Sequence, residues 1–323
     1  MSTPLPLQVR VAAKTREAEG VASFELASLD GSPLPAFSAG AHVDVAIAPG
    51  LTRQYSLCNH PSERHRYLIA VLRDPASRGG SAAMHERVQA GDVLTISEPK
   101  NHFALEAAED YLLLAGGIGI TPILCMAERL AQAGARFRLH YCARSRERAA
   151  FAERLAGSPF ADSVRFHFDA DPDSKLDLAG LLRAARPATH VYVCGPAGFI
   201  DAVTGLAAAQ GWAGGRVHRE YFGAPAQPAG GEGADSEFVV RIASSGRALT
   251  VPSGKTVLAV LQEHGIEIPV SCEQGICGTC VTRVLGGTPE HRDHYLLDEE
   301  RAANDRFTPC CSRACSPELV LDL

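Results

Sequence analysis

The sequence predicts a multidomain chain: an antiparallel β-barrel, then an α/β domain on a parallel sheet, then a small α+β domain. The first hundred residues contain short strands separated by turn residues, whereas apolar strands alternate with helices after Tyr111. A stretch rich in Pro, Gly and Ala at 223–234 is typical of a flexible linker. The length of 323 residues also exceeds what one hydrophobic core usually spans. The predicted domains are 1–106, 107–223 and 236–323, with the linker at 224–235.

The first domain is predicted to be a barrel because its strands are short and alternate in polarity. Val43, Val45 and Ile47 alternate with His42, Asp44 and Ala46, which is typical of a half-buried strand. A second strand is predicted at 67–72, and a short helix at 81–88. Several short strands between Gly, Pro and Asp turns favour an antiparallel barrel.

The second domain is predicted to start with a continuous apolar strand at 111–115, which leads through a glycine turn into a helix at 121–133. The same alternation then continues to residue 209. Its predicted strands are 136–142, 164–168 and 190–194, and its predicted helices are 148–155, 177–185 and 197–209. Strands that are apolar throughout are typical of a parallel sheet covered on both faces.

The third domain carries the most specific pattern of the chain. A predicted hairpin (237–242 and 248–251) and a helix (256–264) lead to a C-x4-C-x2-C loop, and a further cysteine follows after twenty-nine residues. These four cysteines are Cys272, Cys277, Cys280 and Cys310. This is the spacing of plant-type [2Fe–2S] clusters, in which four thiolates hold two irons. Gly275 and Gly278 would let the backbone approach the cluster closely. The assignment of the fourth ligand is weaker than that of the first three, because Cys311 is adjacent to Cys310.

Zinc binding and disulfide formation fit the cysteines less well. Zinc sites usually draw on paired C-x2-C or H-x3–5-H units, and the sequence contains one such pair. Disulfides are not expected, because residues 1–10 lack the apolar core of an export signal, so we expect a reducing cytoplasm. Cys58, Cys125, Cys142 and Cys194 have no metal-like spacing, and most of them are expected to be small buried apolar side chains.

Charge and hydropathy exclude two classes of function. The net charge of −6 and the lack of a basic face argue against nucleic acid as a partner. No apolar run approaches the ~20 residues that a membrane helix needs. Residues 236–323 hold twelve acidic and eight basic side chains. This acidic excess favours either steering of a basic protein partner or ordinary solubility, and charge alone does not separate the two.

Four segments before the linker have the composition of cofactor-binding sites. Arg53-Gln54-Tyr55-Ser56-Leu57 lies in a barrel strand, and Arg78-Gly79-Gly80-Ser81 leads into a helix whose N-terminus can bind a phosphate. Gly116-Gly117-Ile118-Gly119-Ile120-Thr121-Pro122 and Cys194-Gly195-Pro196 each end a strand at the carboxyl edge of the parallel sheet, where such sheets bind ligands. We expect Cys194 to face that crevice. Each segment could also be purely structural, as a polar strand face, a tight turn or a buried cysteine.

Taken together, these segments resemble the ferredoxin–NADP reductase superfamily, specifically the reductase components of Rieske-type oxygenases such as the phthalate dioxygenase and vanillate O-demethylase reductases. The resemblance covers nearly the whole chain and follows the family's order of motifs. The motifs are R-Q-Y-S-L, R-G-G-S, G-G-I-G-I-T-P, C-G-P-A-G-F, H-R-E-Y-F-G, the cysteine loop, and H-R-D-H-Y-L with C-S-R-A. It implies a flavin-binding β-barrel, an NAD-binding α/β domain and a plant-type ferredoxin domain of β-grasp fold.

The resemblance also implies roles for individual residues. Arg53, Gln54, Tyr55 and Ser56 would hold the flavin, with Ser56 near the reactive ring nitrogen and therefore catalytic. Gly80 and Ser81 would bind the flavin phosphate, and the short R-G-G-S segment favours FMN over FAD. The nicotinamide dinucleotide site would be lined by Gly117, Gly119 and Thr121, with Cys194 as a second catalytic residue near the nicotinamide. Phe222 would flank the flavin.

The function that the resemblance implies is electron transfer from NADH through FMN and a [2Fe–2S] cluster to a separate oxygenase. NADPH stays open, because Arg144, Arg146 and Arg148 follow the sheet's second strand, where an arginine can bind a 2′-phosphate. The expected partner is a separate Rieske-type oxygenase that acts on an aromatic acid or a quaternary amine, by demethylation or dihydroxylation. Similar reductases suggest a monomer.

Two alternatives are kept. The first is a haem-thiolate monooxygenase on a separate chain, since no haem domain precedes Met1. The second is a redox-sensing protein whose cofactors are regulatory. A complete nicotinamide site counts against the sensor, because a sensor needs no hydride donor.

Overall fold

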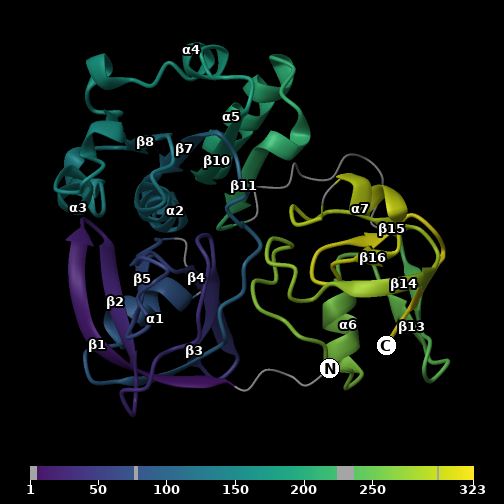
Figure 1. The fold of residues 1–323 in the computed structure, drawn as a ribbon. Helices are drawn as coiled ribbons and strands as arrows, with labels where there is room; N and C mark the ends of the chain where they lie inside the picture. The colour runs from purple at the N-terminus through teal and green to yellow at the C-terminus, as the bar shows by residue number, and fades with distance from the viewer. Residues whose placement is uncertain (1–5, 76–78, 224–235, 297) are drawn as a thin grey trace. The chain divides into compact units, whose positions relative to one another are not determined.

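The computed structural model describes residues 6–75, 79–223, 236–296 and 298–323 (Figure 1). These residues form two compact units, 1–222 and 223–323, and each is described by itself. The predicted linker at 224–235 and Arg78 lie outside the described residues. Among the described residues, no helix is both long and apolar enough to cross a bilayer.

The first unit begins with a six-stranded antiparallel sheet in the order β4-β3-β6-β1-β2-β5. Its strands are β1 (Leu7–Ala18), β2 (Val21–Ser28), β3 (His42–Ala48), β4 (Leu51–Ser56), β5 (Tyr67–Leu72) and β6 (Val93–Ile96). An isolated bridge between Leu57, directly after β4, and Ile69 of β5 links the two ends of the sheet. The predicted barrel is confirmed. Its core contains Val43, Val45 and Tyr67, and α1 (Gly80–Glu86) follows β5.

The second sheet of this unit is parallel and has the order β11-β10-β7-β8-β9. Its strands are β7 (Asp110–Gly116), β8 (Phe137–Ala143), β9 (Val164–Phe168), β10 (Thr189–Gly195) and β11 (Val217–Tyr221). Its helices are α2 (Ile120–Gln132), α3 (Ala152–Ala156), α4 (Leu178–Arg183) and α5 (Ala197–Ala209).

Helices cover both faces of this sheet, as predicted. On β7, Leu113 packs in the cluster that contains α2, whereas Leu112 and Leu114 pack in the cluster that contains Ile200 and Val203 of α5. Successive side chains of a strand point to opposite faces, so a strand between two helical layers is apolar throughout.

Two elements differ from the predictions. The helix expected at 148–155 is only α3 (Ala152–Ala156), because Phe151 has a φ of 61° and a left-handed residue interrupts the helix. A short 3-10 helix, Arg146–Arg148, precedes it. Strand β11 was not predicted. It is an edge strand with a polar sequence, so it lacks the apolar run that marks the other strands.

The second unit has a five-stranded mixed sheet in the order β13-β12-β18-β14-β16. The predicted hairpin is confirmed as β12 (Phe238–Ile242) and β13 (Ala248–Val251), and the predicted helix as α6 (Val257–Glu263). The other elements are β14 (Thr282–Gly286), β15 (Pro289–Glu290), α7 (Asp298–Ala303), β16 (Arg306–Phe307), β17 (Arg313–Ala314) and β18 (Glu318–Leu321). The cysteine loop lies between α6 and β14.

Candidate functional site

Strand β4 and the start of α1 bring two of the predicted cofactor-binding segments together. Gly79, with a φ of 90°, turns the chain into α1. A Cβ on Gly80 would lie 2.6 Å from Cγ and 2.9 Å from Nε of Arg53, so the Arg53 side chain crosses the helix start at a place that only glycine leaves open. A guanidinium next to backbone N–H groups is a suitable environment for a phosphate. Ser81 is adjacent, and its Oγ accepts a hydrogen bond from the Asp74 N–H at 3.1 Å.

The remaining predicted flavin residues follow Arg53 along β4. Gln54, Tyr55 and Ser56 pair across the strands with Asp44, Val43 and His42 of β3. The Oη of Tyr55 is buried, and no hydrogen-bond partner for it is found among the described residues. A buried hydroxyl without a partner destabilises a protein by about 1–3 kcal/mol. A polar group of a bound flavin would satisfy this hydroxyl, so the residues present fit the predicted cofactor.

The glycine turn after β7 and the end of β10 meet at the carboxyl edge of the parallel sheet. A Cβ on Gly119 would lie 2.2 Å from the carbonyl oxygen of Cys194, so the two backbones touch. Gly117 has a φ of 54°, and the position of its missing side chain is open. Thr121 is buried, and its Oγ1 donates to the Ile118 carbonyl at 3.0 Å, which stabilises the turn. The two glycines therefore shape an open edge, whereas the Thr121 hydroxyl is already engaged.

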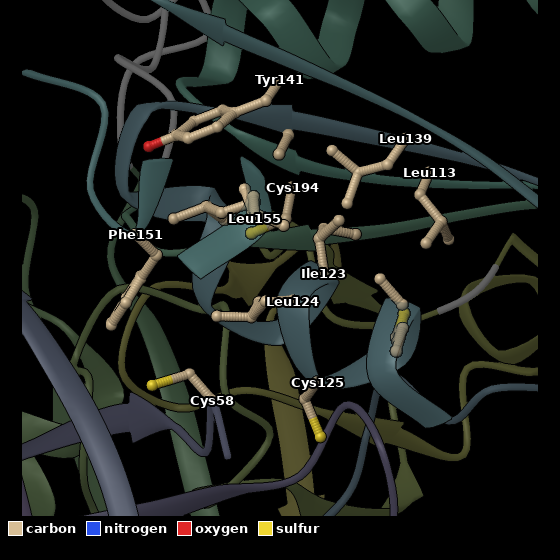
Figure 2. Packing of buried hydrophobic residues seen from close by; sticks show 14 of the residues in the cluster. Cys58, Leu113, Ile123, Leu124, Cys125, Leu139, Tyr141, Phe151, Leu155 and Cys194 are labelled. Atoms are coloured by element: carbon tan, nitrogen blue, oxygen red, sulfur yellow. The ribbon is translucent and has the colours of Figure 1, made fainter. Parts of the chain in front are cut away.

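The expectation that Cys194 faces the crevice is wrong in this structure. Its side chain is fully buried with Ile123 and Leu155 (Figure 2). The cause is strand alternation, which places Cys194 and Tyr192 on the face of β10 that packs in the α2 cluster. Burial raises the pKa of the Cys194 thiol well above its ordinary value, so the group stays protonated.

The structure adds a residue that the sequence analysis missed, Glu220 on β11. Glu220 pairs in register with Cys194 on β10, and its Oε2 accepts a long hydrogen bond of 3.5 Å from the Oγ of Ser56. Burial raises the pKa of the Glu220 carboxyl from 4.5 to about 8, and the Ser56 hydrogen bond opposes this. The available signal was a glutamate inside the H-R-E-Y-F-G motif. The contact joins the predicted flavin strand to the predicted nucleotide sheet. Phe222, directly after β11, is 41% exposed.

In the second unit, the four predicted cluster cysteines are all buried and gather in one place. Hydrogen bonding from the Cys277 and Cys310 thiols lowers the pKa of Cys272, and Cys280 also lies against Cys310. The Gln274 N–H donates to the Cys272 sulfur at 3.3 Å. Four buried thiols with a backbone N–H aimed at one of them fit a [2Fe–2S] cluster.

The loop geometry requires its glycines, and the contacts of Cys310 differ from those of its neighbour Cys311. Gly275 and Gly278 both have a φ of 69°, and a Cβ on Gly275 would lie 2.4 Å from the Cys311 sulfur. Cys310 is buried in a cluster with Cys280 and Leu258, and half-buried Cys311 packs against the same cluster. The Cys311 sulfur lies 3.2 Å from Oγ1 of Thr308, whereas the thiols of Cys272 and Cys280 both contact the Cys310 thiol. This arrangement favours Cys310 as the fourth ligand.

A buried carboxylate holds the segment that faces the cysteine loop. Asp293 is fully buried and accepts hydrogen bonds from the N–H groups of Tyr295 at 3.1 Å and Leu296 at 2.7 Å. The next residue, His294, donates its N–H to the Gly275 carbonyl at 2.8 Å. This segment therefore supports the loop through Gly275.

Comparison with known proteins agrees with this geometry. Residues 240–315, which include all four cysteines, match the family described as a 2Fe-2S iron-sulfur cluster binding domain. The vanillate O-demethylase oxidoreductase of Pseudomonas putida is 56% identical over 315 residues, which cover 97% of this chain and 98% of that protein.

Two solved structures extend the comparison. The structure titled phthalate dioxygenase reductase, "a modular structure for electron transfer from pyridine nucleotides to [2Fe-2S]", is 41% identical with a TM-score of 0.74 and 98% coverage of both chains. An intact type IV self-sufficient cytochrome P-450 monooxygenase is 35% identical with a TM-score of 0.88, and the match covers 100% of this chain but 43% of that longer one. The predicted resemblance and fold are thus confirmed. The chain belongs to the family of oxidoreductases that includes vanillate O-demethylase oxidoreductase and phthalate dioxygenase reductase.

Proposed function

We propose that this protein passes electrons from NADH through FMN and its [2Fe–2S] cluster to a separate Rieske-type oxygenase. When bound, the flavin accepts a hydride and releases its electrons one at a time. The observation that carries the proposal is the Ser56–Glu220 contact, because it joins the β4 strand to the sheet edge that holds Gly117 and Gly119.

Different residues of the first unit would bind different parts of the flavin. Arg53, with Gly80 and Ser81, would bind the flavin phosphate, and the buried Oη of Tyr55 would bond to a polar group of the ring system. Gln54 lies between Arg53 and Tyr55 on the same strand and would complete that set. Phe222 would cover the exposed side of the flavin.

Ser56 and Glu220 would hold a proton next to the reacting atoms. With its pKa raised to about 8, the Glu220 carboxyl is protonated at neutral pH. The Glu220 carboxyl and the Ser56 hydroxyl, which are hydrogen-bonded to each other, would therefore each carry an exchangeable proton. Buried Cys194 would act through its backbone and not through its thiol. Its carbonyl contacts Gly119 and would fix how closely the glycine turn approaches the end of β10.

The preference for NADH over NADPH is supported by the partners of two arginines. Arg148 forms an ion pair with Glu19 at 2.9 Å. The guanidinium of Arg146 lies 5.5 Å from the centre of the Phe168 ring. Both side chains already have partners, which leaves fewer cations to recognise a 2′-phosphate.

The terminal partner is proposed from the relatives. Vanillate O-demethylase oxidoreductase and phthalate dioxygenase reductase are named for systems that act on aromatic acids, which favours a Rieske-type oxygenase for an aromatic acid or a related substrate. A separate haem-thiolate monooxygenase is the second candidate, favoured by the likeness to part of a cytochrome P-450 monooxygenase. We further propose that the chain acts in the cytoplasm as a monomer of 34.2 kDa, a mass that sedimentation equilibrium can check.

Anaerobic titration of the holoprotein with NADH, followed by visible absorbance and low-temperature electron paramagnetic resonance, tests the proposal. We expect flavin bleaching together with a rhombic [2Fe–2S] signal, and slower reduction with NADPH. Flavin reduction without the cluster signal would refute electron transfer to the cluster, and slow reduction by both nucleotides would favour a redox sensor. Adding an oxidised Rieske oxygenase or a haem-thiolate monooxygenase to the reduced protein then identifies the better acceptor.

A further inference from the structure

Three potential metal ligands meet on the first unit, outside the residues used above. His190 lies on β10 and His218 on the adjacent strand β11, and Glu106 belongs to the connection between β6 and β7. One potential ligand atom from each residue lies within 4.8 Å of the other two. The two histidines are half-buried, whereas Glu106 is exposed, so an ion could enter from solvent.

The two imidazoles are hydrogen-bonded to each other. Nδ1 of His190 lies 3.0 Å from Nε2 of His218. The ring centroids are 5.2 Å apart and the planes differ by 21°, so the two rings lie nearly parallel with one nitrogen of each adjacent. Two nitrogens that bind one tetrahedral Zn²⁺ at 2.0–2.1 Å lie roughly 3.3 Å apart. The distance between these two nitrogens is thus within a few tenths of an ångström of that in a zinc site, and the rings would turn slightly so that both lone pairs point at one ion.

Neighbouring tyrosines hold Glu106 and His218 in place. The Glu106 N–H donates to Oη of Tyr192 at 2.8 Å, and Oη of Tyr111 donates to the Glu106 carbonyl at 3.0 Å. The His218 ring stacks on Tyr192, with centroids 4.4 Å apart. Rigid supporting contacts of this kind are what a metal site needs.

We infer that Glu106, His190 and His218 form a binding site for a divalent transition-metal ion of the Zn²⁺ type. Two imidazoles and one carboxylate are a known ligand set for zinc, with a fourth position left to water. Mg²⁺ and Ca²⁺ are poor candidates, because they prefer oxygen ligands only. The site does not depend on flavin, nucleotide or cluster.

The same sheet contains a matched control. His140 on β8 and His167 on β9 form a second pair, with Nδ1 of His140 2.9 Å from Nε2 of His167 and ring centroids 5.2 Å apart. No carboxylate completes this pair as a three-ligand group among the described residues. Nδ1 of His167 donates to the Ser174 carbonyl instead. If histidine pairing alone captured zinc, both pairs would bind it.

The test is equilibrium dialysis of the holoprotein against ZnCl2, with zinc and iron per chain measured by elemental analysis. We expect one zinc per chain in addition to the cluster iron, and weaker binding as the pH falls, because the imidazoles must be deprotonated. His218→Gln and Glu106→Gln should each lower zinc affinity roughly tenfold or more. His167→Gln should bind zinc as the wild type does.

Glu106 is exposed, so Glu106→Gln should fold normally even if His218→Gln does not, and flavin content checks both. Equal zinc affinity in the wild type and Glu106→Gln would overturn the inference. Zinc uptake that is lost in His167→Gln, or that occurs only as iron is lost, would overturn it as well, since the ion would then occupy the other pair or the cysteine loop.

Discussion

Replacing Gly119 with alanine tests whether the contact between two strand ends builds the nucleotide site. The new Cβ would lie 2.2 Å from the Cys194 carbonyl oxygen, 2.4 Å from its carbonyl carbon and 2.6 Å from the Gly195 nitrogen. The carbonyl would have to withdraw by roughly 1 Å before ordinary contact begins at 3.4 Å. All three atoms belong to the backbone, which cannot rotate away as a side chain can. Overpacking of this kind destabilises by about 1–3 kcal/mol, and we expect the upper end of that range.

A loss of about 3 kcal/mol in a unit of this size corresponds to a fall in Tm of roughly 6–12 °C. Thermal unfolding, followed by the release of flavin fluorescence and by circular dichroism, measures it. Because the turn and the end of β10 would separate, the Kd for NAD+, measured by calorimetry, should rise about tenfold or more.

The matched control is Gly117→Ala. The missing Cβ of Gly117 faces open space, and the only penalty is its φ of 54°, which amounts to about 1–2 kcal/mol. We therefore expect a smaller fall in Tm for this variant. If Gly119→Ala kept the wild-type Tm and NAD+ affinity, the close approach of the two strand ends would not be the feature that builds this edge.

Two further predictions concern the cluster and the partly buried Glu220. Cys310→Ser should lose most of its iron and its visible cluster absorption, whereas Cys311→Ser should retain both; the reverse result would reassign the fourth ligand. Glu220→Gln should remove a pH-dependent loss of stability. Because burial raises the folded-state pKa from 4.5 to about 8, stability is highest below pH 4.5 and falls as the pH rises to 8. The difference reaches at most about 3 kcal/mol at pH 7, an upper limit because Glu220 retains some exposure. The Tm of the wild type should therefore drop relative to that of the variant between pH 5 and pH 8, and parallel curves would contradict the raised pKa.

The elements that the sequence predicted well are those whose pattern is local. Strand β7 and helices α2 and α5 lie close to their predicted bounds, because an apolar run or a helical period is written in consecutive residues. The edge strand β11 was missed for the opposite reason: only its pairing with β10 makes its polar sequence a strand. The helix expected at 148–155 was shortened by Phe151, whose left-handed conformation no propensity indicates.

In the candidate site, too, the features written in consecutive residues were predicted, and those that depend on contacts between remote segments were not. The cysteine loop was readable because three of its four thiols lie within nine residues of sequence. The roles expected for Arg53, Gly80, Gly117 and Gly119 came from motifs. The structure adds that Gly80 meets Arg53 and that Gly119 meets Cys194, each across two different elements. The direction of the Cys194 side chain was predicted wrongly, since a one-residue change in strand register decides which face it occupies.

By itself, the sequence determined the class of each domain, the four cysteines and the family of the chain, because spacing and periodicity are properties of consecutive residues. Only the tertiary structure decided that Ser56 meets Glu220, which lies 164 residues further along the chain. It also decided that Cys194 is enclosed by the α2 cluster and that Glu106, His190 and His218 share one site. Contacts between remote strands depend on how the sheets register and pack, and no local pattern encodes that outcome.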